Sequence, residues 1–166
     1  HSEKQNLKIK KTSNIIGVNE MSFSKTLKDT DDSSARLIKN TLSGRNGYGI
    51  DIEIIFKTKT NGWVMMEFLK CEHAYVTPCT SHPRRYWNKN WRKFVKIWEI
   101  AHILNSKLFL VNYEEHELNN YGKFRVMEVN MSVVPSELQI IETKDIIECG
   151  NINDFQKFYM KINDDI

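Results

Sequence analysis

The chain has 166 residues, of which 40% are apolar and 27% charged, and its formal net charge is +3. This length suits one ordinary domain with a single hydrophobic core, and the composition argues against a fibrous or membrane-embedded protein. No apolar run is long enough to span a bilayer. The net charge is too mild to establish an anionic partner, so the distribution of the charges matters more than their sum.

The chain contains three cysteines, Cys71, Cys79 and Cys149. An odd number of cysteines in a chain of this size argues against a disulfide framework. Free thiols are typical of proteins kept in a reducing compartment. We therefore expect reduced cysteines and a cytoplasmic protein.

One domain is expected, because no internal repeat or low-complexity linker divides the chain. Residues 1–11 are predicted to form a flexible basic arm, and residues 12–166 a single α/β domain. A first helix is expected over residues 35–42, after a cluster of capping residues at 31–34. Residues 43–49 contain three glycines and interrupt the chain.

The clearest strand pattern is in residues 50–56, where apolar and acidic residues alternate before the run becomes apolar throughout. Thr-Asn-Gly at residues 60–62 predicts a hairpin turn, and residues 63–69 the returning strand. This second strand is apolar on both faces, which indicates a central position in the sheet. A single acid, Glu67, interrupts it, and Lys70 stands at its end.

A long helix is expected over residues 84–105. Its buried face is marked by apolar residues at helical spacing: Trp87, Trp91, Phe94, Trp98 and Ala101. Strands are expected over residues 107–113 and 123–132, and a final helix over residues 153–161. If the strands before and after the long helix pair in parallel through a crossover, the chain forms an α/β sandwich around a mixed sheet.

Acidic side chains are expected to converge at one end of the hairpin. The start of the first strand lies near the end of the second, so Asp51, Glu67 and Lys70 can share one region of the sheet. Buried carboxylates are costly unless a cation compensates them, and one or two carboxylates commonly hold Mg²⁺ beside substrate phosphates. Glu53, on the same face as Asp51, is a further possible ligand. The competing interpretation is a structural ion pair between Glu67 and Lys70 or an arginine.

This order of elements, with Gly-Tyr-Gly-Ile-Asp at residues 47–51 opening the hairpin, resembles the PD-(D/E)xK nuclease superfamily, which includes restriction endonucleases and Holliday-junction resolvases. The resemblance covers residues 33–113. It implies a restriction-endonuclease-like sandwich, in which helices flank a mixed β-sheet. It also implies an Mg²⁺-dependent nuclease, with Mn²⁺ as a possible substitute, in which Asp51 and Glu67 bind the metal and Lys70 is catalytic.

The spacing of the acid and the lysine departs from that family. Two residues separate Glu67 from Lys70, whereas the family has one. In a regular strand Lys70 points away from the face that carries Glu67, and only a β-bulge would return it there. A shifted active face that includes Glu72 is the alternative. In some members of the family a glutamate on an early helix joins the site, and Glu20 is the candidate here.

The long helix opens with a basic and aromatic segment that contains six basic residues between Arg84 and Lys96. Such charges suit contacts with nucleic-acid phosphates. The residues expected to make these contacts are Arg84, Arg85, Lys89 and Arg92. The alternative is an ordinary solvated helix face, and the tryptophans fit the core better than exposed stacking platforms.

Four possible zinc ligands lie within twelve residues: Cys71, His73, Cys79 and His82. Their spacing is not that of a common zinc finger, so zinc is unlikely and ordinary loop chemistry is favoured. A further reading makes His73 or His82 an active-site base.

These observations predict a metal-dependent nuclease, specifically a DNA endonuclease that hydrolyses phosphodiester bonds and has no membrane partner. A nuclease that cuts both strands commonly acts as a homodimer. The alternatives are a non-catalytic nucleic-acid-binding module of the same fold and a protein-interaction domain.

Overall fold

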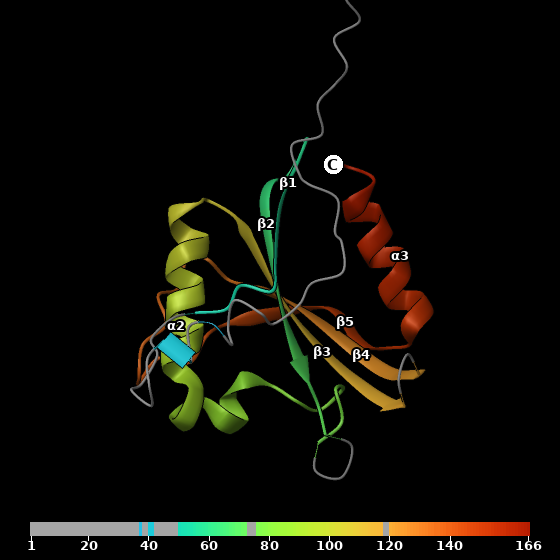
Figure 1. Cartoon of the computed structure of the whole chain (residues 1–166), viewed down its shortest axis with the longest axis horizontal. Helices are drawn as coiled ribbons and strands as arrows, with labels where there is room; N and C mark the ends of the chain where they lie inside the picture. Colours follow the sequence, from blue (N-terminus) through green and yellow to red (C-terminus); the bar gives the residue numbers. More distant parts are fainter. Residues whose placement is uncertain (1–36, 38–39, 42–49, 73–75, 118–119) are drawn as a thin grey trace, which may run out of the picture.

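The computed structural model describes residues 37, 40–41, 50–72, 76–117 and 120–166. The expected basic arm, most of the helix expected over residues 35–42, and the candidates Glu20 and His73 lie outside the described residues. Within them, a five-stranded sheet is flanked by α2 on one face and α3 on the other (Figure 1). The predicted α/β architecture with a mixed sheet is confirmed.

The predicted hairpin is formed by β1 (Ile54–Thr58) and β2 (Gly62–Lys70), which pair antiparallel from Ile54↔Met66 to Thr58↔Gly62. The turn ends at Gly62, whose φ of 70° lies in the left-handed region that glycine adopts without strain. The Thr58 hydroxyl oxygen accepts a hydrogen bond from the Asn61 N–H at 2.9 Å. Because β1 begins at Ile54, Asp51 precedes the strand instead of opening it.

The predicted long helix is also present. The 3₁₀ turn η1 (Pro83–Tyr86) leads into α2 (Trp87–Ile103), which connects β2 to β3 (Lys107–Glu117). β2 and β3 pair in parallel, and their register runs without a shift from Val64↔Lys107 to Lys70↔Tyr113. The crossover expected from the sequence is thus confirmed.

The second half of the sheet consists of β4 (Asn120–Val129) and β5 (Thr143–Gly150), and the strand order is β1-β2-β3-β4-β5. The sequence did not predict β5, because most of its residues are exposed and show no regular alternation. The predicted final helix is α3 (Ile152–Asn163). Asn151 and Asp154 form a capping box at its start, in which each side chain accepts from the other residue's backbone N–H.

The alternation of side chains along β2 separates two hydrophobic cores. Met65 and Leu69 pack with the buried face of α2, whereas Val64, Met66 and Phe68 pack in the core covered by α3. This alternation is the geometric basis of the site, because it assigns each polar residue of β2 to one face of the sheet.

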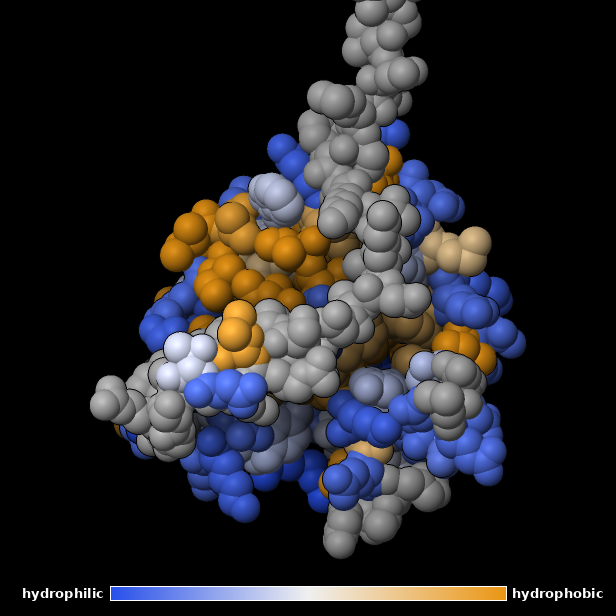
Figure 2. Space-filling view, viewed as in Figure 1, coloured by the Kyte–Doolittle hydropathy of each residue, from blue (hydrophilic) through white to orange (hydrophobic). Residues whose placement is uncertain are grey.

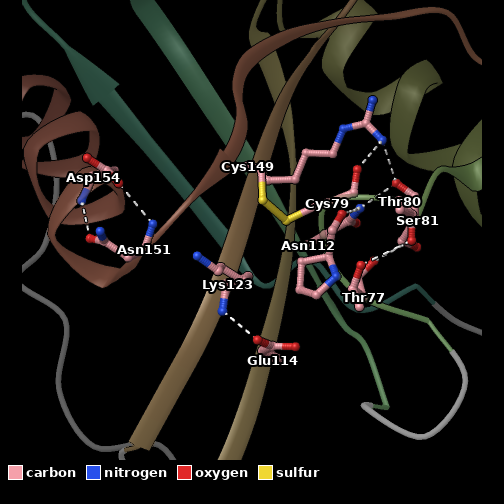
Figure 3. Close-up of a disulfide and its surroundings, with 12 residues drawn as sticks. Thr77, Cys79, Thr80, Ser81, Asn112, Glu114, Lys123, Cys149, Asn151 and Asp154 are labelled. Atoms are coloured by element: carbon pink, nitrogen blue, oxygen red, sulfur yellow. Dashed lines mark hydrogen bonds between the residues drawn. A yellow bond between two sulfur atoms is a disulfide. The ribbon is translucent and has the colours of Figure 1, made fainter.

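A disulfide joins Cys79, in the loop before η1, to Cys149 near the end of β5 (Figure 3). Cys71 is free and buried. The prediction of reduced thiols is therefore wrong for this pair. The two residues are separated by 70 positions in the sequence but by only 4.8 Å between Cα atoms, a proximity that no count of cysteines can reveal. None of the helices in the described ranges is long and apolar enough to cross a membrane.

Candidate functional site

Glu67 is the most unusual polar residue of the sheet. It lies in the middle of the apolar strand β2, only 2% of its surface is exposed, and its position places it on the face covered by α2. The ammonium of Lys93, from α2, contacts its Oε1. The Lys93 side chain is 46% exposed, so this ion pair joins a buried carboxylate to a cation that reaches solvent.

Burial raises the pKa of Glu67, and the Lys93 ammonium opposes this shift without cancelling it. The negative charges of Glu53 and Asp51 raise the pKa further. Both residues are exposed and lie close enough to influence Glu67 electrostatically. We call Asp51, Glu53 and Glu67 the acidic cluster. The structure therefore brings together the acids that the sequence singled out around the hairpin.

Glu53 is fixed to the end of the hairpin by a specific contact. Its Oε2 accepts a hydrogen bond from the backbone N–H of Phe68 at 2.8 Å. Ile50, on the other side of Asp51, packs against the core on the α2 face. The segment that carries the two exposed acids is thus anchored at both ends, next to Glu67.

Lys70 lies elsewhere. The continuous register between β2 and β3 contains no bulge, so Lys70 keeps the parity of Phe68 and points away from the face of Glu67. Its Nζ donates to Glu115 Oε2 at 2.7 Å, and this contact raises the pKa of Lys70. The predicted placement of Lys70 beside Glu67 is wrong, and so is the alternative in which Lys70 or an arginine pairs with Glu67. Glu72 is exposed and shares a groove with Lys70.

Lys93 supplies the cation that the sequence analysis assigned to Lys70. Its position was recognisable in principle, because Lys93 directly precedes Phe94 and lies four residues before Ile97, both of which are fully buried. Helical spacing places its Cβ at the border of the buried face. A long side chain at such a border can reach toward the sheet while its stem covers apolar surface.

A groove of about 640 Å³ lies beside the acidic cluster, between the end of β2 and the start of α2. Arg85, Tyr86 and Asn90 contribute to its helix side, and Leu69 to its sheet side. Burial raises the pKa of Tyr86 to about 12, and Cys71 and Glu67 add to the shift. The Tyr86 hydroxyl therefore stays protonated at neutral pH and lies within electrostatic range of Glu67.

The basic residues predicted to contact phosphate are exposed at the start of α2: Arg84, Arg85, Lys89 and Arg92. Figure 2 shows a hydrophilic surface over this end of the helix. Of the four, Arg85 lines the groove, while the Arg92 guanidinium lies 4.7 Å from the centre of the Trp91 ring. A cationic surface thus adjoins the acidic cluster.

The loop that held the possible zinc ligands is organised by other contacts. Cys79 is in the disulfide, so it offers no thiolate to a metal. His82 caps η1, since its Nδ1 accepts from the Arg84 N–H at 3.1 Å, while its Nε2 lies 3.1 Å from the Thr143 hydroxyl. Burial, Arg125 and Arg84 lower the pKa of His82. Asn112 donates to the Ser81 carbonyl at 2.8 Å and fastens the loop to the sheet (Figure 3).

The donor set at the acidic cluster suits a small divalent cation bound with substrate. Across the described part of the chain, no group of three or more His, Cys, Asp or Glu side chains is arranged to hold a metal. Mg²⁺, however, often uses one or two carboxylates and completes its shell with water and phosphate oxygens. Glu67 Oε1 is buried and, apart from the Lys93 contact, has no hydrogen-bond partner. Glu67 and Asp51 fit such a two-carboxylate site.

No protein-family model, curated protein or solved structure matches this chain. A functional assignment therefore depends on the geometry of the acidic cluster, Lys93 and the groove.

Proposed function

We propose that the chain is a metal-dependent nuclease, most specifically a DNA endonuclease, with a restriction-endonuclease-like fold. The observation that carries the proposal is Glu67, a carboxylate buried in an apolar strand and held by Lys93 beside two further acids. Burying a charge destabilises a fold unless it is well compensated. Titratable groups with perturbed pKa values at the edge of a groove are candidates for catalysis.

In this proposal Glu67 and Asp51 hold Mg²⁺, or Mn²⁺ in its place. The bound metal would lower the pKa of a coordinated water and neutralise charge on the scissile phosphate. Lys93 takes the role that the resemblance gave to Lys70, and donates from its ammonium to the attacking water or to a phosphate oxygen. Arg85 contacts the phosphate backbone in the groove, and Arg84, Lys89 and Arg92 do so along the helix.

The test is cleavage of supercoiled plasmid and of single strands with Mg²⁺ or Mn²⁺. The proteins compared are the wild type, Glu67→Gln, Lys93→Met and the control Lys157→Met, which changes an exposed lysine of α3. We expect metal-dependent cutting by the wild type and the control, and loss of cutting in the other two. Undiminished cutting by Glu67→Gln, or no cutting by the wild type, would refute the proposal.

The second candidate is a non-catalytic nucleic-acid-binding module of the same fold. The observation in its favour is that Lys93 already compensates Glu67 as a structural ion pair. This candidate predicts salt-sensitive binding through the start of α2 without cleavage. A protein-interaction domain predicts neither cleavage nor salt-sensitive binding, so one cleavage assay and one binding titration distinguish the three.

The cytoplasmic location and the homodimer stay predictions. The Cys79–Cys149 disulfide favours an oxidising compartment over the cytoplasm. Alkylation of free thiols in protein taken directly from its source measures this. One reactive cysteine, Cys71 after unfolding, would indicate an oxidising location, and three would indicate the cytoplasm.

A further inference from the structure

A second cavity, of about 490 Å³, lies on the opposite face of the sheet from the groove, beneath the start of α3. Its lining combines aromatic rings with one charged side chain, the carboxylate of Glu53. The rings are Phe68, Tyr113, Tyr121, Phe124 and Phe155. They come from β2, β3, β4 and α3, so the cavity is built on regular elements and not on a loop.

The rings form a layered arrangement. Phe124 stacks on Phe155 with centroids 4.8 Å apart and planes at 6°, and on Tyr113 with centroids 6.4 Å apart and planes at 22°. Phe68 presents its edge to both Tyr113 and Phe155. Phe124 is buried, whereas Tyr121 is 38% exposed. Such layers accept a further flat ring with little rearrangement.

Glu53 connects this cavity to the acidic cluster. Its Oε2 is held by the Phe68 N–H, and its charge raises the pKa of Glu67 on one face of the sheet and of Tyr113 on the other. A ligand in the aromatic cavity therefore lies next to the residues proposed to cleave the substrate.

We propose that this cavity binds one unpaired nucleobase of the nucleic-acid substrate, with a preference for a base that carries an exocyclic amino group. The inference rests on the proposed nuclease function. Every base has a face that stacks on aromatic rings, and a glutamate carboxylate accepts from the amino group of cytosine. Thymine places carbonyl oxygens where cytosine has its amino group, and these repel the carboxylate. The cavity thus selects cytosine over thymine at a nucleotide beside the scissile phosphate.

The probes are dCMP and dTMP, titrated without metal into ¹⁵N-labelled protein and followed by NMR shifts. We expect dCMP to shift residues around the cavity and dTMP to bind about tenfold more weakly. Tyr121→Ala should weaken dCMP binding by at least about tenfold, whereas Tyr121→Phe retains the ring and should stay within about twofold of the wild type. Glu53→Gln should bring the two affinities close together. Because Tyr121 is partly exposed, both Tyr121 variants are expected to fold, which their own NMR spectra check.

Three results would overturn the inference: no shifts around the cavity, dCMP binding unchanged in Tyr121→Ala, or tighter binding of tetramethylammonium than of dCMP. The last would identify a cage for an organic cation, which aromatic rings also favour. The nuclease proposal is tested separately by plasmid cleavage. A chain that cuts but shows no cavity shifts loses only the nucleobase pocket, and a chain that shows the shifts but does not cut loses only the nuclease.

Discussion

Replacing Lys93 with methionine tests the ion pair at the centre of the candidate site. Methionine keeps the length and apolar character of the lysine stem but removes its charge. Glu67, which is 2% exposed, is then left without the ammonium that contacts its carboxylate. Removing one partner of a buried pair is destabilising, because the other charge remains buried without compensation.

The size of the effect follows from the geometry. Breaking a fully buried pair lowers the free energy of unfolding by about 3–5 kcal/mol. Because the Lys93 side chain is 46% exposed, solvent screens part of the interaction, and we expect a loss of about 2 kcal/mol at neutral to basic pH. In a protein of this size that corresponds to a melting temperature lower by about 6 °C.

The pH dependence gives the prediction its sign. The folded-state pKa of Glu67 lies above its ordinary value of 4.5, so the folded protein binds the proton more tightly than the unfolded chain. Stability therefore falls as the pH rises from the unfolded pKa through the folded one. Lys93 is the group that opposes the upward shift. In Lys93→Met the folded pKa rises further, so the variant loses more stability at high pH and recovers it in acid.

The assay is urea unfolding at about pH 5 and about pH 8, on either side of the titration. Lys93→Met should differ from the wild type mainly at the higher pH, and Lys157→Met at neither. The double variant Glu67→Gln/Lys93→Met should recover the lost stability, because the neutral amide needs no counter-charge. Equal destabilisation at both pH values, or no recovery in the double variant, would refute the reasoning.

Three further outcomes are expected. Reversing two charges with Arg85→Glu and Lys89→Glu should weaken nucleic-acid binding and flatten its dependence on salt by about 0.9 logarithmic unit per lost phosphate contact, measured by fluorescence anisotropy. Reducing the disulfide should lower the free energy of unfolding by about 4 kcal/mol in the chain-entropy model, since the bridged cysteines are 70 residues apart. Reductant should not affect a Cys79→Ser variant. The lowered pKa of His82 means that stability is complete above its ordinary pKa and declines as the pH falls through the shifted range, and His82→Gln should remove this decline in urea titrations.

Local patterns in the sequence predict much of this fold. The hairpin, the crossover helix and its parallel strands follow from alternation, turn residues and helical spacing, all of which act over a few neighbouring residues. β5 has no such pattern. It joins the sheet as an edge strand paired with β4, and its mostly exposed residues carry little hydrophobic signal.

The candidate site was predicted in its acids and missed in its cation. Asp51, Glu53 and Glu67 belong to one hairpin, so the turn brings them together. Lys93 reaches Glu67 only because α2 packs on the sheet, and Cys79 meets Cys149 only because the sheet brings β5 to the loop before η1. Both contacts depend on packing between segments far apart in the sequence, which local patterns do not encode.

The hairpin also explains how two different surfaces meet at one place. The pairing of β1 with β2 ends at Ile54↔Met66, while β2 continues to Lys70. Beyond that point the Glu53 carboxylate, instead of a strand carbonyl, accepts from the Phe68 N–H. Alternation sends Glu67 toward Lys93 and Phe68 toward the aromatic cavity. Since β1 is the edge strand, the segment before it is free of a second neighbour and can place one carboxylate where its charge acts on both faces. A lysine two positions after Glu67 would face α2, whereas Lys70 is three positions away, so the helix is the element that supplies the cation.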